Sequence, residues 1–359
     1  MSGNSFGHFL VLTTFGESHG PAVGGILDGF PSLVKIDPEF IQSELNRRRT
    51  GQSFFSSGRK EEDRLDILSG VFEGTSTGAP IAFLAKNTDA KPEHYEQLKE
   101  AYRPSHADFT WEKKFGIRDY RGGGRSSARE TLARVAGGAL AKSYLKKFNI
   151  TIQGYTSEIG GCALPADFFP PDLHSVLTSP VGCPHAETEA AMIALLEEAR
   201  NEGDTLGGIV SCLIRGVPEG LGEPVFDKLS AGLAKAMLSI PAVKGFDYGS
   251  GFAAAGMKGS AHNDLFVHKK GSTTTSTNFS GGIQGGISNG NDIFFRVAFK
   301  PVASLMRDQE TVNSRGEKVL LKGKGRHDVC VVPRAIVVVE AMAALVIADH
   351  HLMRQQQAG

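Results

Sequence analysis

The stretch "RDYRGGGRSSARETLARVAGGALAKSYLKKF", residues 118–148, decides the fold, because a glycine-rich loop here leads directly into a helix. Residues 122–124 predict a flexible turn, and the pattern at residues 127–130 predicts a capping box at the helix start. Four apolar residues then recur at helical spacing and predict a buried face: Leu132, Val135, Ala139 and Leu140.

The same stretch places Arg121, Arg125 and Arg129 around the predicted helix N-terminus. Free backbone N–H groups, serine hydroxyls, the positive end of a helix and guanidinium groups together suit a phosphate or a carboxylate. The alternative is an ordinary capped helix with exposed arginines. A Walker loop is excluded, because the Gly-Lys-Ser/Thr ending is absent. The coincidence of loop, cap and arginines favours an anion site.

A second motif, "GESHG" at residues 16–20, fits the G-x-S-x-G pattern of a serine hydrolase nucleophile elbow. That elbow requires a helix directly after the serine. Here Pro21 and the glycines that follow predict an irregular loop and a second strand instead. A hydrolase is therefore disfavoured, and Ser18 and His19 become candidates for other chemistry.

Composition narrows the class of protein. The 359 residues carry 39 basic and 39 acidic side chains, so no global field attracts nucleic acid or a membrane. The four cysteines lie far apart, which argues against a zinc site and a disulfide scaffold and fits a reducing cytoplasm. No segment resembles a signal peptide or a membrane span, and no metal-binding spacing occurs. We expect a cytoplasmic globular protein without a metal.

Residues 37–49 predict a helix that is capped by Asp37. We interpret the three arginines in its last turn as complementing the helix dipole on a solvated face. Residues 66–86 predict strands broken by the turn "GTSTGAP". Further elements are expected as helices at 187–202 and 225–240 and as strands at 207–217 and 292–299. The polar residues 268–292 predict a long functional or mobile loop.

"GGILDGFP" (residues 24–31) and "GGIVSCLIRGVP" (207–218) each precede a predicted helix and resemble one another. This similarity is weak support for a duplicated α+β unit. We therefore expect a single domain over residues 1–359, with a possible internal repeat of about 1–150 and 200–350.

Three further polar clusters could carry chemistry: "RPSHAD" with His106, "KPVAS" with Lys300, and "KGRHDVC" with Asp328, which we place before an apolar strand. His19 and His106 are natural general acids or bases, because histidine titrates near neutrality. The alternative for each is a hydrogen-bonded structural histidine. The residues alone point to an enzyme that acts on a small polyanion, with the reaction class open.

Many motifs, in order from about Gly3 to His351, strongly resemble those of the chorismate synthase family: "TTFGESHG", "RRR", "LSGVFEG", "TSTG", "RPSHAD", "RDYRGGGRSSARET", "GLGEPVFDKL", "AVKGF", "GGIQGGISNG", "KPVAS" and "KGRHDVC". The resemblance implies an α+β fold, an internally duplicated β-α-β sandwich of helices and antiparallel sheets. It also implies a cytoplasmic homotetramer.

The activity implied is that of a carbon–oxygen lyase acting on phosphates. It is the anti-1,4-elimination of phosphate and the C6 hydrogen from 5-enolpyruvylshikimate-3-phosphate, giving chorismate. Reduced FMN is required without net redox change, and the chain has no segment for a flavin reductase, so an external NAD(P)H-dependent system must supply it. The alternatives are a flavin-dependent oxidoreductase on a small polyanion and a flavin- or phosphate-binding protein without catalysis.

The resemblance also implies residue roles. His19 would protonate the departing phosphate, His106 would protonate the reduced flavin near N1, and Ser18 and Asp328 would relay the proton taken up at N5. Four arginines would bind substrate: Arg48, Arg103, Arg129 and Arg334. The expected cofactor contacts are Arg125, Ser126, Ser127, Pro241, Ala242, Gly285, Lys300, Pro301, Val302, Ala303, Ser304 and Arg326.

Three positions depart from the family pattern. Phe54 stands where many relatives carry a second basic residue, which Arg59 or Lys60 could replace. Pro241 replaces an amide side chain, so a flavin contact there can only use the backbone. Ala303 lacks a hydroxyl that related sequences often have.

Overall fold

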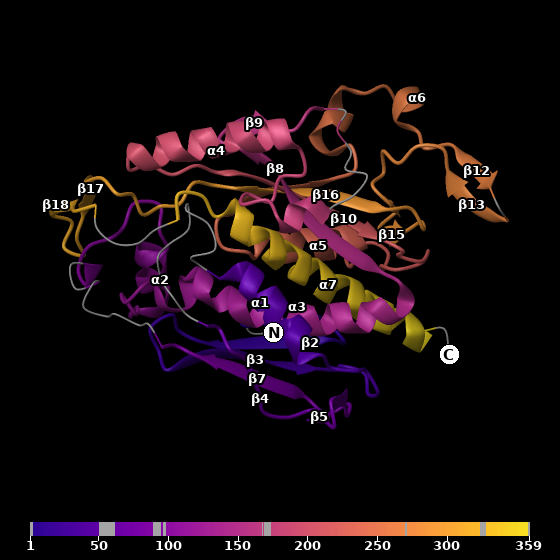
Figure 1. Ribbon diagram of the computed structural model, residues 1–359, viewed down its shortest axis with the longest axis horizontal. Coiled ribbons are helices and arrows are strands. Elements are labelled where there is room, and N and C mark those ends of the chain that lie inside the picture. Colours follow the sequence, from indigo (N-terminus) through magenta and orange to yellow (C-terminus); the bar gives the residue numbers. More distant parts are fainter. Residues whose placement is uncertain are drawn as a thin grey trace.

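A computed structural model describes residues 3–49, 62–88, 95, 98–166, 168, 174–269, 271–323 and 328–357. Two antiparallel five-stranded sheets enclose a layer of helices (Figure 1). The first sheet has the order β1 (Ser5–Phe6), β2 (Val11–Gly16), β3 (Ala22–Asp28), β7 (Ile81–Lys86) and β4 (Asp66–Ile67). The second has the order β11 (Val243–Tyr248), β16 (Ile293–Phe299), β10 (Gly208–Arg215), β8 (Thr151–Ile159) and β9 (Cys162–Ala163).

Four helices form the layer between the sheets: α1 (Pro38–Arg48), α3 (Thr131–Leu145), α5 (Leu229–Leu238) and α7 (Val332–Gln357). Helix α7 is buried on all sides for most of its length, as expected of a helix that is apolar all round. Among the described helices, none is long and apolar enough to cross a membrane. Because the helix layer lies between the two sheets, the hydrophobic core lies on both faces of the central helices.

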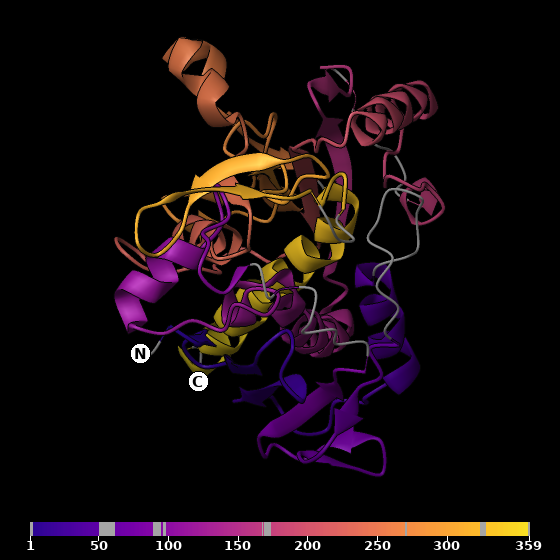
Figure 2. The same ribbon diagram turned by 90° about the vertical axis from the view of Figure 1, so that its left-hand side faces the viewer.

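The remaining elements are attached to these two sheets and the helix layer between them. Helix α4 (Ala186–Asn201) lies on the outer face of the second sheet (Figure 1). Figure 2 shows α2 (Asp108–Phe115) at the side of the molecule beside the hairpin of β17 (Gln309–Val312) and β18 (Lys318–Leu321). The smaller elements are β5 (Val71–Phe72), β6 (Thr75–Ser76), β12 (Phe266–Lys269), β13 (Ser272–Thr275), β14 (Ile283–Gln284), β15 (Ile287–Ser288) and α6 (Gly259–His262).

The two sheets share one strand order. The chain runs through β2, β3, α1, β4, β7 and α3 in the first half, and through β8, β10, α5, β11, β16 and α7 in the second. The corresponding sheet orders are β2-β3-β7-β4 and β8-β10-β16-β11. We propose that these are the two copies of an internal repeat, with the second copy beginning at β8 and not near residue 200.

Several sequence predictions are confirmed. Asp37 caps α1 by accepting hydrogen bonds from the backbone of Glu39 and Phe40, and α4 and β16 lie within a residue of their predicted bounds. Helix α5 begins at Leu229, later than expected, because the backbone N–H of Glu223 donates to the carbonyl of Asp227 and closes a turn first. The strand expected after Asp328 is wrong, since this segment begins α7.

The prediction of a loop at residues 268–292 is correct only in part. Residues 276–282 and 289–292 lie outside the strands, but two hairpins, β12–β13 and β14–β15, occupy other parts of this stretch. Asp264 stabilises the connection between them, because its carboxylate accepts hydrogen bonds from the backbone of Phe279 and Ser280, each 2.8 Å long. Backbone pairing and this carboxylate order a segment whose composition alone suggested a loop.

The solvated face predicted for the arginines of α1 is wrong for Arg47 and Arg48. Arg47 donates to Glu44 (2.8 Å) and to both carboxylate oxygens of Glu340 on α7 (2.7 and 2.9 Å). Lys142 on α3 contacts the same two glutamates. The last turn of α1 therefore faces the other helices, and its charges are neutralised inside the protein.

Candidate active site

The "GESHG" turn joins β2 directly to β3. Ser18 and His19 are both buried, and the Ser18 hydroxyl lies 3.1 Å from His19 Nδ1. The same hydroxyl donates to the carbonyl of Arg121 (3.2 Å), and the backbone N–H of Ser18 donates to Gly124 (3.3 Å). The predicted strand–turn–strand arrangement is confirmed, and the glycine-rich loop lies against this turn.

Two successive glycines of that loop lie against the two candidate histidines. A Cβ atom on Gly122 would approach His19 Cε1 to 2.4 Å, and one on Gly123 would approach His106 Cε1 to 3.0 Å. Both glycines have a positive φ, which side-chain-bearing residues rarely adopt. The loop therefore brings His19 and His106, which are far apart in sequence, to one place.

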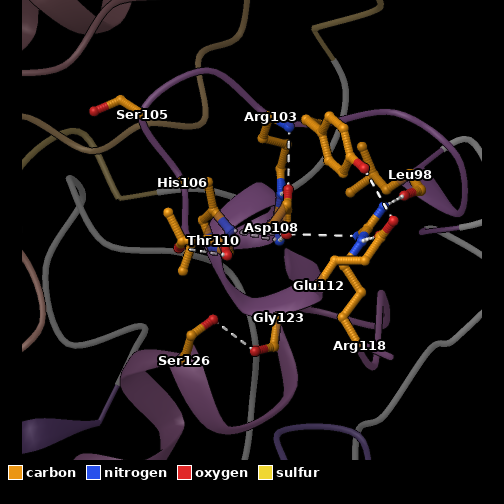
Figure 3. Close-up of polar contacts among 12 residues, drawn as sticks. Leu98, Arg103, Ser105, His106, Asp108, Thr110, Glu112, Arg118, Gly123 and Ser126 are labelled. Atoms are coloured by element: carbon orange, nitrogen blue, oxygen red, sulfur yellow. Dashed lines mark hydrogen bonds and ion pairs between the residues drawn. The ribbon is translucent and has the colours of Figure 1, made fainter. Parts of the chain in front are cut away.

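His106 is fixed by the carboxylate of Asp108, the first residue of α2 (Figure 3). His106 Nδ1 lies 3.0 Å from Asp108 Oδ1 and 3.0 Å from Arg103 Nη2. Arg103 also donates to both oxygens of Asp108, at 2.8 Å each. The predicted substrate arginine of this motif is thus held on the carboxylate beside the histidine.

The hairpin of β17 and β18 supports this motif from the side. The backbone of Tyr102 donates to Val312 (3.2 Å), and the Thr311 hydroxyl donates back to Tyr102 (2.6 Å). Lys300 donates to both the carbonyl and the hydroxyl of Ser105, each at 2.6 Å. The structure therefore brings "RPSHAD" and "KPVAS" together.

Two more predicted substrate arginines share one buried carboxylate. Arg48 and Arg129 each form an ion pair with Asp63, one on each oxygen. Burial alone would raise the pKa of Asp63, but the charges of both arginines outweigh burial and hold it below its usual value. Asp63 therefore stays ionised and lets two guanidinium groups lie side by side.

Asn87 connects this arginine pair to the serine–histidine turn. Its side-chain oxygen accepts from Arg129 Nε (2.9 Å), and its amide donates to the carbonyls of Glu17 (3.0 Å) and Gly20 (2.7 Å). On the other side, Arg334 donates to the carbonyl of Arg48 (2.9 Å) and pairs with Asp328. These contacts join the predicted substrate residues Arg48, Arg129 and Arg334 to Ser18, His19 and Asp328.

The predicted capping box is half correct. Ser127 accepts from the backbone of Arg129 (3.3 Å), but Glu130 pairs with Arg134 and does not return to the serine. The first turn, residues 128–130, is a 3₁₀ helix that continues into α3. Because this turn is tighter than an α-helical turn, the Ser127 hydroxyl accepts its hydrogen bond from Arg129, the second residue of the helix, and not from the third.

The predicted cofactor residues of the loop lie close to the histidines. Ser126 donates to the carbonyl of Gly123 (2.7 Å), and its hydroxyl is 3.2 Å from the Cβ position of that glycine. Arg125 turns toward β2, where it donates to the carbonyls of Gly16 (3.2 Å) and Thr14 (3.3 Å). In this structure the Arg125 guanidinium ties the loop to the first sheet.

A second group of predicted cofactor residues gathers at the end of β16. The backbone N–H of Lys300 donates to the carbonyl of Ala242 (2.9 Å), which places residues 241–242 beside residues 300–304. The Val302 carbonyl accepts from the Thr205 hydroxyl (2.9 Å). Pro301, Ala303 and Ser304 are at least partly accessible at the same end of the strand.

Gly285 is placed apart from the other predicted cofactor residues. It occupies the turn between β14 and β15 and lines a cavity of about 720 Å³ that includes Phe246, Tyr248 and His262. Of the predicted cofactor residues within the described part of the chain, it alone lines this cavity. Arg326, Phe54, Arg59 and Lys60 lie outside the described residues.

Sequence reasoning missed Asp63 and Asn87. Each lies outside the recognised motifs, and its partners are far away in sequence: Arg129 is 66 residues from Asp63 and 42 from Asn87. The only available signal was the need of clustered arginines for a compensating acid.

A family model for chorismate synthase matches residues 10–352. The chain belongs to the chorismate synthase family. It is 57% identical to the chorismate synthase of Cytophaga hutchinsonii, with 97% of each chain covered, and 56% identical to that of Christiangramia forsetii, with 99% of each covered. The chorismate synthase of Phocaeicola vulgatus is 55% identical over 98% of both chains.

A solved structure titled as a crystal structure of chorismate synthase superposes with a TM-score of 0.78 at 31% identity. The match covers 97% of this chain and 93% of that chain. The α+β fold expected from the resemblance is confirmed, and the protein is a lyase of this family.

Proposed function

We propose that the protein catalyses the anti-1,4-elimination of phosphate and the C6 hydrogen from 5-enolpyruvylshikimate-3-phosphate to give chorismate, with reduced FMN and no net redox change. The chain belongs to the chorismate synthase family, and one observation carries this proposal: His19 and His106 converge on successive glycines of an arginine-rich loop. Two histidines beside a cluster of guanidinium groups suit proton transfer near a departing phosphate.

The cations near "KPVAS" fit an anionic cofactor. Burial first, and then the positive charge of Lys244, lower the pKa of Lys300. Two ammonium groups close enough to repel each other are relieved by a bound anion, so a phosphate-bearing cofactor matches this cluster. Lys300 holds Ser105 next to His106, which joins the cationic cluster to a candidate proton donor.

When bound, reduced FMN would supply electron density that helps the phosphate to leave. The residues of the chain would position and protonate. His19 would give a proton to the departing phosphate while Ser18 holds its Nδ1 side, and His106 would hold a proton near the flavin N1 edge. Ser18 and Asp328 would relay the proton taken up at N5.

Arginines would bind the anionic groups of the substrate. Arg48 and Arg129 lie together on Asp63, Arg103 lies beside His106, and Arg334 contacts Asp328. Guanidinium groups bind carboxylates and phosphates with paired hydrogen bonds, which an ammonium group cannot match. The cofactor contacts proposed are the loop residues 125–127, residues 241–242 and 300–304, Gly285 and Arg326.

We further propose that the protein works in the cytoplasm as a homotetramer and receives reduced FMN from a separate NAD(P)H-dependent reductase. The test is anaerobic: purified protein, 5-enolpyruvylshikimate-3-phosphate and dithionite-reduced FMN, with chorismate absorbance and released phosphate followed together. We expect equal amounts of both products with the flavin still reduced at the end. Flavin oxidation in proportion to product would show a net redox reaction instead, and folded protein that binds FMN but gives no product would contradict the proposal.

The variant His106→Ala tests the assigned proton transfer in the same assay. We expect turnover to fall by about 100-fold or more, since general acid–base catalysis typically contributes that much. His268→Ala is the matched control, because His268 is exposed on β12. An unchanged rate for His106→Ala would remove His106 from the mechanism.

A further inference from the structure

We infer that Asp108 is a positioning residue for His106: it keeps hydrogen on Nδ1, so that Nε2 is the nitrogen left to exchange a proton. Asp108 is only 3% exposed, and its Oδ1 lies 3.0 Å from His106 Nδ1. Figure 3 shows the carboxylate between His106 and the two arginines of the cluster, Arg103 and Arg118. The neighbours of the imidazole therefore select its protonated nitrogen.

Arginines hold the carboxylate in place from the other sides. Arg103 donates to Asp108 with its backbone N–H (3.1 Å), with Nε (2.8 Å) and with Nη2 (2.8 Å). Arg118 Nη1 lies 3.6 Å from Oδ1. Burial alone would raise the pKa of Asp108, but hydrogen bonds from Arg103 and His106 outweigh burial and hold this pKa far below its usual value. Asp108 is therefore ionised and can only accept hydrogen bonds.

The ionised carboxylate decides between two arrangements of the imidazole. If Nδ1 were bare, it could accept from Arg103 Nη2 at 3.0 Å, but it would then face Asp108 Oδ1 as two acceptors at the same distance. If Nδ1 carries hydrogen, it donates to Oδ1, and Arg103 Nη2 still has its own acceptor on Asp108 at 2.8 Å. The second arrangement gives both His106 Nδ1 and Arg103 Nη2 an acceptor, so the hydrogen belongs on Nδ1.

The hydrogen on Nδ1 leaves Nε2, on the other side of the imidazole ring, as the nitrogen that can react. Nε2 lies 3.3 Å from the Cβ position of Gly123, and the Ser126 hydroxyl lies 3.2 Å from that same position. The missing side chain of Gly123 leaves space directly in front of the Nε2 edge. With Nδ1 committed to Asp108, Nε2 is the atom that exchanges a proton with a bound molecule.

Within the described residues, the charged side chains near this motif contact one another or Ser105. Arg103 and Arg118 both face Asp108, Glu112 on α2 takes the other side of Arg118 (2.8 Å), and Lys300 reaches Ser105 from the end of β16. The alternative role for Asp108 is an acid in the first turn of α2 that stabilises the helix dipole. Such a role would not depend on which nitrogen of His106 carries hydrogen.

Neutron diffraction from deuterium-exchanged crystals of the unaltered protein at pH 8 tests the inference directly. We expect a deuteron on His106 Nδ1 directed at Asp108. A bare Nδ1, with the deuteron on Nε2 alone, would overturn the inference. This measurement needs neither substrate nor flavin, so it stands or falls separately from the proposed reaction.

The variant Asp108→Asn tests the consequence for turnover, and this part rests on the proposed function. The arginines will hold the amide oxygen, so the amide NH₂ will face His106 and favour the opposite tautomer. A change of this kind at the aspartate of a serine protease triad lowers kcat by about 10⁴-fold. Here we expect a loss of about 100-fold or more, comparable with His106→Ala.

Glu112→Gln is the matched control, because it removes another carboxylate from Arg118 and Tyr102 without contacting His106. We expect near-normal turnover for this variant. Neutron data for Asp108→Asn should show the deuteron moved to Nε2. If Asp108→Asn kept both the Nδ1 deuteron and full turnover, the positioning role would be contradicted.

Discussion

Gly122 lies directly against the imidazole of His19: a Cβ atom on the glycine would be 2.4 Å from Cε1 and 2.5 Å from Nδ1. The same Cβ position is 2.9 Å from the Ser18 hydroxyl. Because these are the side chains proposed to handle protons, the absence of a side chain at this residue is part of the site. The glycine loop is therefore a steric requirement of the site and not only a flexible turn.

Gly122→Ala should lower turnover by on the order of 100-fold, because displacing a reacting group by about 1 Å can cost that much. Gly116→Ala is the matched control: Gly116 has φ +73° against +66° for Gly122, but nothing lies within 4 Å of its Cβ position. Both variants bear the strain of a left-handed residue, roughly 1 kcal/mol. Equal turnover for the two, measured in the anaerobic assay, would show that the close approach does not matter.

Asp63→Asn should lower the free energy of unfolding by roughly 3–5 kcal/mol, because removing one partner of a buried ion pair typically costs that much. Arg48 and Arg129 both pair with this carboxylate, and all three side chains are nearly inaccessible. Urea denaturation measures the change, with the exposed Asp66 as control in Asp66→Asn. A loss no larger than that of Asp66→Asn would mean that the arginines find another anion.

Glu340 should make the stability of the protein sensitive to acid. Burial alone would raise its pKa, but Lys142 and Arg47 outweigh burial and lower the pKa from 4.5 to about 2. A carboxylate whose pKa is depressed on folding contributes stability that is complete above pH 4.5 and is lost as the pH falls toward 2.

Unfolding free energies from pH 6 to pH 2 test this contribution. Wild type should lose more stability over this range than Glu340→Gln, whose side chain cannot titrate. Glu197→Gln, on the exposed side of α4, should follow the wild-type pH profile. Parallel curves for wild type and Glu340→Gln would show that Glu340 is not coupled to Arg47 and Lys142.

Local signals in the sequence predicted the elements that are made by local contacts. The Asp37 cap, the turn after "GESHG" and the glycine loop each depend on residues within a few positions of one another. Helix α7 gave no such signal, because it is buried on nearly every side and therefore shows no amphipathic period. Its first residues were interpreted as a strand for the same reason.

The polar connections of the site could not be predicted, because they join residues that only the fold brings together. Arg47 and Glu340 are 293 residues apart, and Lys300 and Ser105 are 195 apart. The family motifs identified the arginines but not the acid between them. Hydrophobic periodicity reports which face of an element is buried, and it carries no information on which buried charges meet.

The crossing of α3 and α7 gives the sharpest test of the central layer. A Cβ atom on Gly138 would lie 2.3 Å from Ala341 Cβ and 2.4 Å from its Cα, so Gly138→Ala must push two buried helices apart. Overpacking of this kind typically costs about 1–3 kcal/mol, and backbone contact places it at the upper end. For Gly137→Ala, one residue earlier, the three atoms nearest to the new Cβ all belong to the Leu12 side chain, the first at 3.1 Å. There the helix propensity of alanine, about 1 kcal/mol better than glycine, offsets the tighter contact. Urea denaturation should show a large loss for Gly138→Ala and almost none for Gly137→Ala, and equal losses would mean that the two helices do not cross at Gly138.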